Sequence, residues 1–243
     1  MGPHSLSIVV PFLNEEGAVK SVIIEIFGAL RGFNFEVIAV DDGSSDNTAA
    51  ILKQMAAEDD RIRVIRHRRR AGQSSAIRSG VKAARHAWIA TLDGDGQNPP
   101  DQILRLIEQV SDADCSRVGI VQGERAVRQD TLAKRWGSRI ANTVRSTLLN
   151  DGTRDSGCGL KLFRRNAYLD LPFFDHLHRF MPAMMLREGW EVRFVDVSHR
   201  PREFGRSNYS NLNRTLVGLV DLVGVLWLIK RRSPLNEKGD TPS

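Results

Sequence analysis

Two carboxylates one residue apart, Asp93 and Asp95, directly follow the apolar segment 88–92. On a turn, this spacing offers the oxygen ligands that Mg²⁺ or Mn²⁺ prefers, and a metal held in this way bridges substrate phosphates. Asp and Gly are also ordinary loop residues, so the pair alone is equally consistent with a simple turn. The pair therefore raises the hypothesis of a metal site at 93–95 without deciding it.

A second acidic pair, Asp41 and Asp42, follows the apolar segment 35–40. A carboxylate at a strand end accepts hydrogen bonds from a base or ribose in nucleotide-binding sheets, but it equally serves as a turn residue or helix cap. The stretch 11–15 (PFLNE) closes the first apolar segment in the same way. Three polar loops converging on one rim indicate a binding site.

Alternating strand and helix patterns position these loops. We expect strands at 6–11, 35–40, 62–65 and 88–92, and helices at 16–30, 46–57, 74–85 and 98–110. Repeated strand–helix units predict an α/β fold with a mostly parallel sheet and helices on both faces. In such sheets the ligand lies at the carboxyl ends of the strands, where both acidic pairs fall.

The second half of the chain is less regular. We expect strands at 119–123, 160–163 and 191–197, and helices at 132–149 and 181–188. We divide the chain into a catalytic domain at 1–210 and a C-terminal segment at 211–243.

The C-terminal segment contains the apolar stretch 215–229, which is interrupted by Asp221 and followed by three basic residues. About 15 helical residues span about 22 Å, short of the roughly 30 Å hydrocarbon core of a bilayer. We therefore expect a helix that lies in the membrane interface, with the basic residues on anionic headgroups. The alternatives are a buried C-terminal helix or a subunit contact.

Composition bounds the class of protein. The 243 residues suffice for one α/β domain with a small appendage, and 41% hydrophobic and 26% charged residues are typical of a globular chain. Two cysteines exclude a disulfide framework, and no secretory signal is visible, so we expect a reducing compartment. The net charge of +6 suits an anionic partner.

Five stretches together resemble the family-2 glycosyltransferases with the GT-A fold, which is Rossmann-like. Within that family they are most similar to the polyprenol-phosphate glycosyltransferases, the group that includes dolichol-phosphate mannose synthase. The stretches are 11–15 (PFLNE), 40–46 (VDDGSSD), 71–76 (AGQSSA), 93–97 (DGDGQ) and 202–210 (REFGRSNYS). The R-x-x-G-x-S element in the last stretch points to the lipid-phosphate branch.

The resemblance implies a role for each matching residue. The nucleotide-binding set comprises Pro11, Leu13, Glu15, Ala39, Asp41, Asp42, Asp93, Gly94 and Asn208. The metal ligands would be Asp93, Asp95 and Gln97. The catalytic set comprises Asp95, Arg125, Lys134, Ser138 and Arg202.

Within the catalytic set, Arg125 would reach a phosphate and Arg202 would close over the donor diphosphate. Lys134 and Ser138 would receive the acceptor phosphate. Asp155 matches an acid of the family's middle loop, with a role either in substrate binding or in loop structure. The chain departs from the family pattern at Leu13, Gly94 and Asn208, where an aromatic residue, Ala and Lys respectively occur in relatives.

The resemblance implies a metal-dependent, inverting transfer of a sugar from UDP- or GDP-hexose to a polyprenyl phosphate, giving a lipid-linked sugar for the cell envelope. The expected cofactor is Mg²⁺ or Mn²⁺, and the expected partners are the nucleotide-sugar, the lipid phosphate, an anionic membrane surface and a possible second copy of the chain. We expect a peripheral protein on the cytoplasmic face of the membrane.

Two alternatives stay open from the sequence. One is a family-2 enzyme with a soluble or polysaccharide acceptor. The other is a non-catalytic nucleic-acid-binding protein, suggested by the basic run 66–70. That reading is disfavoured, because the strand-end carboxylates would repel phosphates without a metal, and we expect no nucleic-acid partner.

Overall fold

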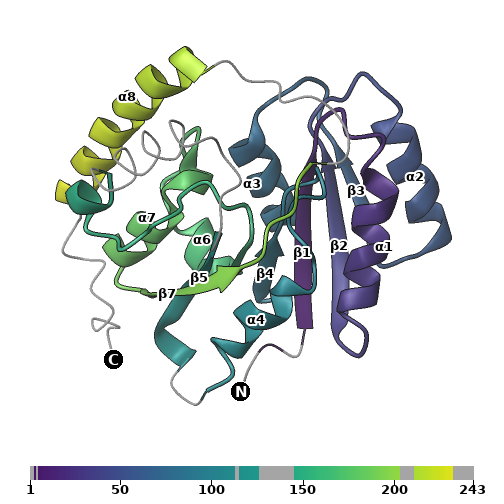
Figure 1. The fold of residues 1–243 in the computed structure, drawn as a ribbon, viewed down its shortest axis with the longest axis horizontal. Coiled ribbons are helices and arrows are strands. Elements are labelled where there is room, and N and C mark those ends of the chain that lie inside the picture. Colours follow the sequence, from purple (N-terminus) through teal and green to yellow (C-terminus); the bar gives the residue numbers. More distant parts are fainter. Residues whose placement is uncertain (1–2, 4, 113–114, 126–144, 203–210, 232–243) are drawn as a thin grey trace, which may run out of the picture.

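The computed structural model describes residues 3, 5–112, 115–125, 145–202 and 211–231. Within these residues, strands of one sheet lie in the order β3-β2-β1-β4-β6-β5-β7 (Figure 1). The strands are β1 Ser5–Phe12, β2 Asn34–Asp41, β3 Ile62–Arg66, β4 Trp88–Thr91, β5 Val118–Arg125, β6 Lys161–Arg164 and β7 Glu191–Val197. The order places β1 and β4 at the centre, next to each other.

The sheet is mostly parallel, as the sequence predicts. Strand β1 pairs in parallel with β2 and β4, β2 with β3, and β5 with β7. Strand β6 runs antiparallel to both of its neighbours, β4 and β5. The strand–helix alternation of the first half is not continued regularly in the second half of the sequence, so the direction of β6 could not be read from it.

Helices cover both faces of the sheet. On one face α1 Val19–Ala29, α2 Thr48–Glu58 and α4 Gln102–Glu108 enclose one hydrophobic cluster. On the other, α3 Gln73–Ala83, α6 Arg165–Leu169, η2 Leu177–Arg179, α7 Met181–Arg187 and α8 Asn211–Lys230 enclose a second cluster. A short helical turn, η1 Cys115–Arg117, precedes β5.

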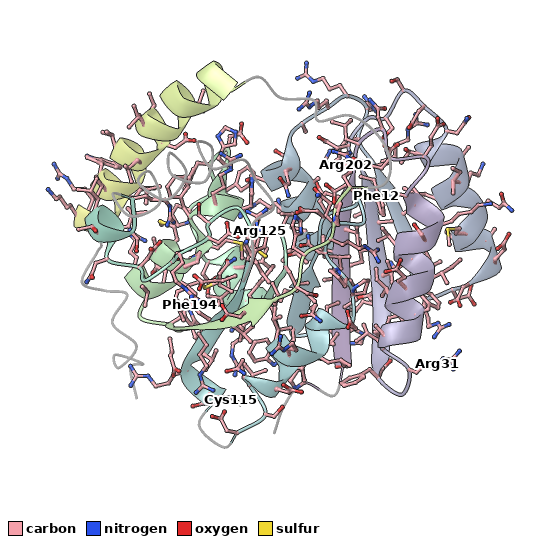
Figure 2. All side chains as sticks on the ribbon, in the orientation of Figure 1. Phe12, Arg31, Cys115, Arg125, Phe194 and Arg202 are labelled. Carbon is pink, nitrogen blue, oxygen red and sulfur yellow. The ribbon has the colours of Figure 1, made fainter. Side chains whose placement is uncertain are left out.

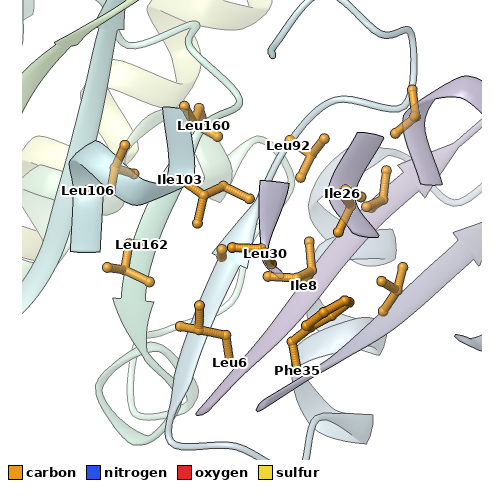
Figure 3. Packing of buried hydrophobic residues seen from close by; sticks show 14 of the residues in the cluster. Leu6, Ile8, Ile26, Leu30, Phe35, Leu92, Ile103, Leu106, Leu160 and Leu162 are labelled. Carbon is orange, nitrogen blue, oxygen red and sulfur yellow. The ribbon is translucent and has the colours of Figure 1, made fainter. Parts of the chain in front are cut away.

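The pleat of the strands divides the apolar residues between the two clusters. In β1, Leu6 and Ile8 belong to the cluster under α1 and α4, whereas Val9 belongs to the cluster under α3. Figure 3 shows Leu6 and Ile8 packed close to Leu30 and Phe35. Because the central strands are buried on both faces, they read as continuous apolar runs, which is typical of parallel sheets.

Helix α8 packs on the domain through one side. Leu222 and Val225 are buried in the second cluster, and Asp221 Oδ2 lies 2.8 Å from Nδ1 of His176. Arg187 of α7 donates to the carbonyl oxygen of Leu228 over 2.9 Å. The acidic residue that interrupts the apolar stretch therefore has a histidine partner at the seam between α8 and the domain.

The other side of α8 is exposed and apolar. Val220, Val223 and Trp227 expose 72%, 67% and 59% of their surface, and their spacing places them along one stripe of the helix. Among the residues that the structure describes, no helix combines the length and hydropathy needed to cross a bilayer.

Candidate active site

The carboxyl ends of β1, β2 and β4 bring three polar loops to one edge of the sheet. Phe12, the last residue of β1, pairs in register with Asp41, the last residue of β2. The loops are joined directly: Asn14 N donates to Ser44 Oγ over 2.9 Å, and Ser45 N donates to Asn14 Oδ1 over 2.8 Å. The convergence of these loops, expected from the sequence, is confirmed.

Asp93 is held from several sides. Gln73 Nε2 donates to its Oδ1 over 2.8 Å, and Asn98 Nδ2 donates to its Oδ2 over 3.2 Å. A Cβ at Gly159 would lie 2.3 Å from that carboxylate, so only glycine fits there. Burial, and next the neighbouring Asp95, raise the pKa of Asp93 above its usual value.

Asn98 is therefore part of the site. The sequence reading treats it as the cap of a helix that starts at 98, but α4 begins at Gln102. The two prolines at 99 and 100 carry the chain to that helix and leave Asn98 buried against Asp93.

Lys161 supplies a buried positive charge beneath the acidic turn. Its side chain is 2% exposed, and Nζ donates to the carbonyl oxygen of Cys158. Burial lowers the pKa of Lys161, while the nearby charge of Asp93 acts in the opposite direction. Sequence reasoning missed this residue, although a lysine in the middle of the apolar strand 160–163 is a visible signal, since lysine is almost never fully buried without a partner.

Asp95, Glu15 and Arg202 meet at the mouth of the site. Arg202 Nη2 donates to Glu15 Oε1, and Arg202 Nη1 lies 4.0 Å from Asp95 Oδ2 (Arg202 is labelled in Figure 2). Burial raises the pKa of Glu15, and the contact with Arg202 only partly offsets it. Oε2 of Glu15 is buried without a hydrogen-bond partner. Three residues of the expected donor site are thus brought together from segments up to 187 positions apart.

The turn 93–97 fits a divalent cation that is shared with a substrate. Within the described part of the chain, no group of three or more His, Cys, Asp or Glu side chains is placed to hold a metal by itself. The main-chain N–H of Gln97 donates to Asp95 Oδ1 over 3.1 Å, and 18% of the Asp95 side chain is exposed. Mg²⁺ is commonly held by one or two carboxylates together with substrate phosphates, and this oxygen set suits that arrangement.

Arg125 ends β5 and is oriented by Asp155. Its Nε lies 2.5 Å from Asp155 Oδ2 and its Nη2 lies 2.8 Å from Asp155 Oδ1, a two-pronged ion pair with both partners largely buried. Burial opposes the charge of Arg125, but Asp155 outweighs it and raises the pKa of the guanidinium. Asp155 was expected either to bind substrate or to support the loop; it contacts Arg125 and also accepts from Gly157 N over 3.3 Å within its own loop. Burial also raises the pKa of the neighbouring Cys158 thiol to about 11, which fits a structural residue.

Asp41 and Asp42 are both engaged by the basic loop 66–72. Asp41 is fully buried, accepts from Ser44 N over 2.9 Å and lies 3.1 Å from Nε of Arg66. The contact with Arg66 is an ion pair, and Asp41 Oδ2 is otherwise buried without a hydrogen-bond partner among the described residues. The basic run that suggested nucleic-acid binding is thus attached to the edge of the site through Arg66.

The carboxylate of Asp42 fastens that loop. It accepts from the main-chain N–H groups of Ala71 and Gly72 over 2.9 and 2.8 Å, and His67 Nδ1 lies 2.7 Å from it. All of these contacts are internal, so the structure supports a positioning role for Asp42 more directly than the expected contact with the nucleotide.

The remaining expected residues lie at the ends of β1 and β2. Pro11 and Leu13 are partly exposed at the rim, whereas Ala39 is fully buried in the hydrophobic cluster, so its side chain does not line an open pocket. A Cβ at Gly94 would lie 2.6 Å from the Pro11 carbonyl oxygen, which explains glycine at this position. Lys134, Ser138 and Asn208 lie outside the described residues.

His178 is a buried, neutral histidine behind the site. Its Nδ1 lies 2.8 Å from Ser74 Oγ at the start of α3, and burial, followed by the nearby charge of Arg179, lowers its pKa well below the usual value. These contacts indicate a structural role for His178. Trp190 is 9% exposed and packs in the second cluster.

The depressed pKa of His178 predicts a loss of stability in acid. In the unfolded chain His178 takes up a proton near pH 6.5, whereas in the folded protein it stays neutral to lower pH. The stability of the folded state is therefore unaffected by this group above pH 6.5 and falls as the pH decreases below it. The free energy of unfolding should fall by up to about 1.4 kcal/mol per pH unit from this group. Denaturant unfolding of wild type and His178→Gln between pH 7 and 5 measures it. Equal slopes for the two proteins would contradict the assignment.

Comparisons with known proteins agree with this geometry. The model of the family described as glycosyl transferase family 2 matches residues 7–171. An undecaprenyl-phosphate 4-deoxy-4-formamido-L-arabinose transferase of Pseudomonas fluorescens (strain SBW25) is 33% identical over 210 residues, which are 85% of this chain and 60% of that protein. A dodecaprenyl-phosphate galacturonate synthase of Rhizobium johnstonii is 31% identical over 94% of this chain and 68% of its own length.

Solved structures share the fold. Glucosyl-3-phosphoglycerate synthase from Mycobacterium tuberculosis, in complex with Mn²⁺, uridine diphosphate and glucosyl-3-phosphoglycerate, matches with a TM-score of 0.67 at 17% identity. The match covers 93% of this chain and 79% of that one. The chain spans about 60% of the length of the Pseudomonas relative, so the likeness concerns this part of that protein.

Proposed function

The chain belongs to glycosyl transferase family 2, and from this premise we propose that it transfers a sugar from a nucleotide-sugar to a polyprenyl phosphate. One observation carries the proposal: Asp95, Glu15 and Arg202 meet at the carboxyl edge of a GT-A sheet. The acceptor class is supported by the two relatives named for undecaprenyl- and dodecaprenyl-phosphate products.

The donor diphosphate is the group that these charges suit. Bound Mg²⁺ or Mn²⁺, held by Asp95 with Asp93 and Gln97, would neutralise negative charge on the departing nucleoside diphosphate. Arg202 already lies beside Asp95, and its guanidinium can grip two phosphate oxygens. Arg125, fixed by Asp155, presents a second oriented cation on the β5 side of the site.

The acceptor requires little proton chemistry. A lipid phosphate is already anionic at neutral pH, so positioning it against the anomeric carbon replaces the need for a strong general base. Direct attack then inverts the anomeric configuration. The resemblance assigns acceptor binding to Lys134 and Ser138, and the division into a catalytic domain at 1–210 and a C-terminal segment at 211–243 remains a prediction.

A panel of nucleotide-sugars tests the proposal. UDP- and GDP-hexoses are incubated with Mn²⁺ or Mg²⁺ and either a short polyprenyl phosphate in detergent or a soluble phosphorylated acceptor. We expect one donor to yield a lipid-phosphate sugar of inverted configuration. Transfer to the soluble acceptor alone, or no transfer from any donor, would contradict the proposed acceptor or the proposed reaction.

The apolar stripe of α8 is the proposed contact with an anionic membrane surface at its cytoplasmic face. Val220, Val223 and Trp227 point away from the domain, and Lys230 and Arg231 follow at the end of the helix. An amphipathic helix of this kind lies in the headgroup region, where basic residues meet anionic lipid. A lipid-phosphate acceptor keeps its tail in the same membrane.

Two charges on this stripe should release the protein from vesicles. Val220→Glu with Val223→Glu puts carboxylates where the helix would enter the lipid, and we expect at least about a tenfold loss of partition, measured by flotation with vesicles containing anionic lipid. Ile24→Glu, at a residue 64% exposed on α1, is the matched control and should float like wild type. If the double variant floats normally but a dimer dissociates in sedimentation, the stripe is a contact between two copies of the chain.

A further inference from the structure

We propose that Arg200 and Glu25 are a positioning pair, which fixes the segment carrying Arg202 against the turn 95–97. The proposal rests on the proposed function, because it takes that turn to hold the metal and Arg202 to hold the donor diphosphate. Neither residue of the pair belongs to the set expected from the sequence.

Arg200 is bound to the turn by both its main chain and its side chain. Its main-chain N–H donates to the Gln97 carbonyl oxygen over 3.0 Å, and its Nε donates to the carbonyl oxygen of Gly96. In return, Gln97 Nε2 donates to the Arg200 carbonyl oxygen over 3.4 Å. Since Gln97 is itself an expected metal ligand, Arg200 constrains both the path of the turn and the side-chain amide of Gln97.

Glu25 holds the guanidinium in this position from α1. Arg200 Nη2 lies 2.9 and 2.8 Å from Glu25 Oε1 and Oε2, so the guanidinium bridges the helix and the turn. About a third of each side chain is exposed. Surface pairs of this kind contribute little to global stability, so stabilising the fold is a weak explanation of the contact.

Three contacts hold the segment that runs from β7 to Arg202. Arg105 donates to the Asp196 carbonyl oxygen, Ser198 N donates to Gln102 Oε1, and Arg200 binds the turn. Figure 1 shows this green segment leaving β7 and running toward the end of β1. Of these three anchors, Arg200 is the one that binds residues 96 and 97, and Arg202 follows two residues later. Arg200 therefore helps to set the distance of 4.0 Å between Arg202 Nη1 and Asp95 Oδ2.

A double-mutant cycle separates positioning from a plain surface ion pair. Arg200→Gln, Glu25→Gln and the double variant are compared with Arg105→Gln, which removes an anchor of the same segment away from the turn. Three quantities are measured for each: the affinity for Mn²⁺ in the presence of UDP by calorimetry, kcat and KM for the donor, and the melting temperature.

We expect Arg200→Gln to weaken Mn²⁺ binding and to lower kcat, each by roughly tenfold, because misplacement of binding groups slows a reaction at small cost in stability. Glu25→Gln should act in the same direction but less, and the double variant should match Arg200→Gln alone. Arg105→Gln should leave Mn²⁺ affinity and kcat unchanged.

Two results would contradict the proposed positioning role of Arg200 and Glu25. One is wild-type Mn²⁺ affinity and kcat in Arg200→Gln; the other is effects of the two substitutions that add independently. If the wild-type chain binds neither Mn²⁺ with UDP nor any donor, the proposed function fails, and the positioning role fails with it. If only the positioning role is wrong, the wild-type protein still binds Mn²⁺ with UDP and transfers the sugar.

Discussion

Asp95→Asn is expected to lower kcat by at least about 100-fold, which corresponds to about 2.7 kcal/mol of transition-state stabilisation. Asparagine has nearly the shape of the native side chain, so the change removes charge and leaves the turn intact. The reason for the loss is that the carboxylate would hold the cation against the departing diphosphate. Transfer rates at saturating donor measure it.

Two comparisons make this result specific to the metal. Asp101→Asn, which neutralises an exposed carboxylate at the start of α4, should retain wild-type turnover. Excess chelator should abolish wild-type transfer, and Mn²⁺ should restore it, whereas Asp95→Asn should need far more Mn²⁺. Full turnover of Asp95→Asn, or of wild type in chelator, would refute the metal assignment.

Arg202→Ala is expected to reduce kcat/KM for the donor by roughly 100-fold, or about 2.7 kcal/mol, because a guanidinium that grips the diphosphate is lost. The melting temperature should change far less. Removing Arg202 leaves Glu15 without the contact that favours its ionised form, so its pKa rises further and protonation relieves the buried charge.

Arg202→Lys tests whether the charge alone or the paired hydrogen bonds of the guanidinium are needed. Lysine keeps the charge but cannot form two parallel hydrogen bonds, so we expect partial recovery of kcat/KM and full recovery of stability. Thermal unfolding and donor kinetics are measured on the same preparations. A loss of stability in Arg202→Ala as large as the loss of activity would mean that this arginine is structural, serving mainly to neutralise Glu15.

Much of the fold and part of the site follow from local sequence. The strands at 35–40 and 191–197 appear within a residue of the positions expected, because buried apolar runs and their flanking turns are set by neighbours along the chain. Parallel strands put their carboxyl ends at one edge, so the meeting of the loops after β1, β2 and β4 could also be deduced.

What the polar groups contact was decided only by tertiary structure. Asp93 against Gln73 and Asn98, Arg125 against Asp155, and Arg200 against Glu25 join segments 5 to 175 positions apart. The family resemblance implies a nucleotide contact for Asp42, and the structure shows in addition that its carboxylate holds the loop 66–72.

The physical reason is the range of the forces involved. Periodic burial of apolar side chains repeats along a few turns or a strand, so it leaves a pattern in adjacent residues. A hydrogen bond or ion pair depends on distances of about 3 Å between groups whose sequence separation carries no information. The sequence therefore determined the sheet, its functional edge and the acidic turn, whereas folding alone decided which residues orient that turn and which cations meet it.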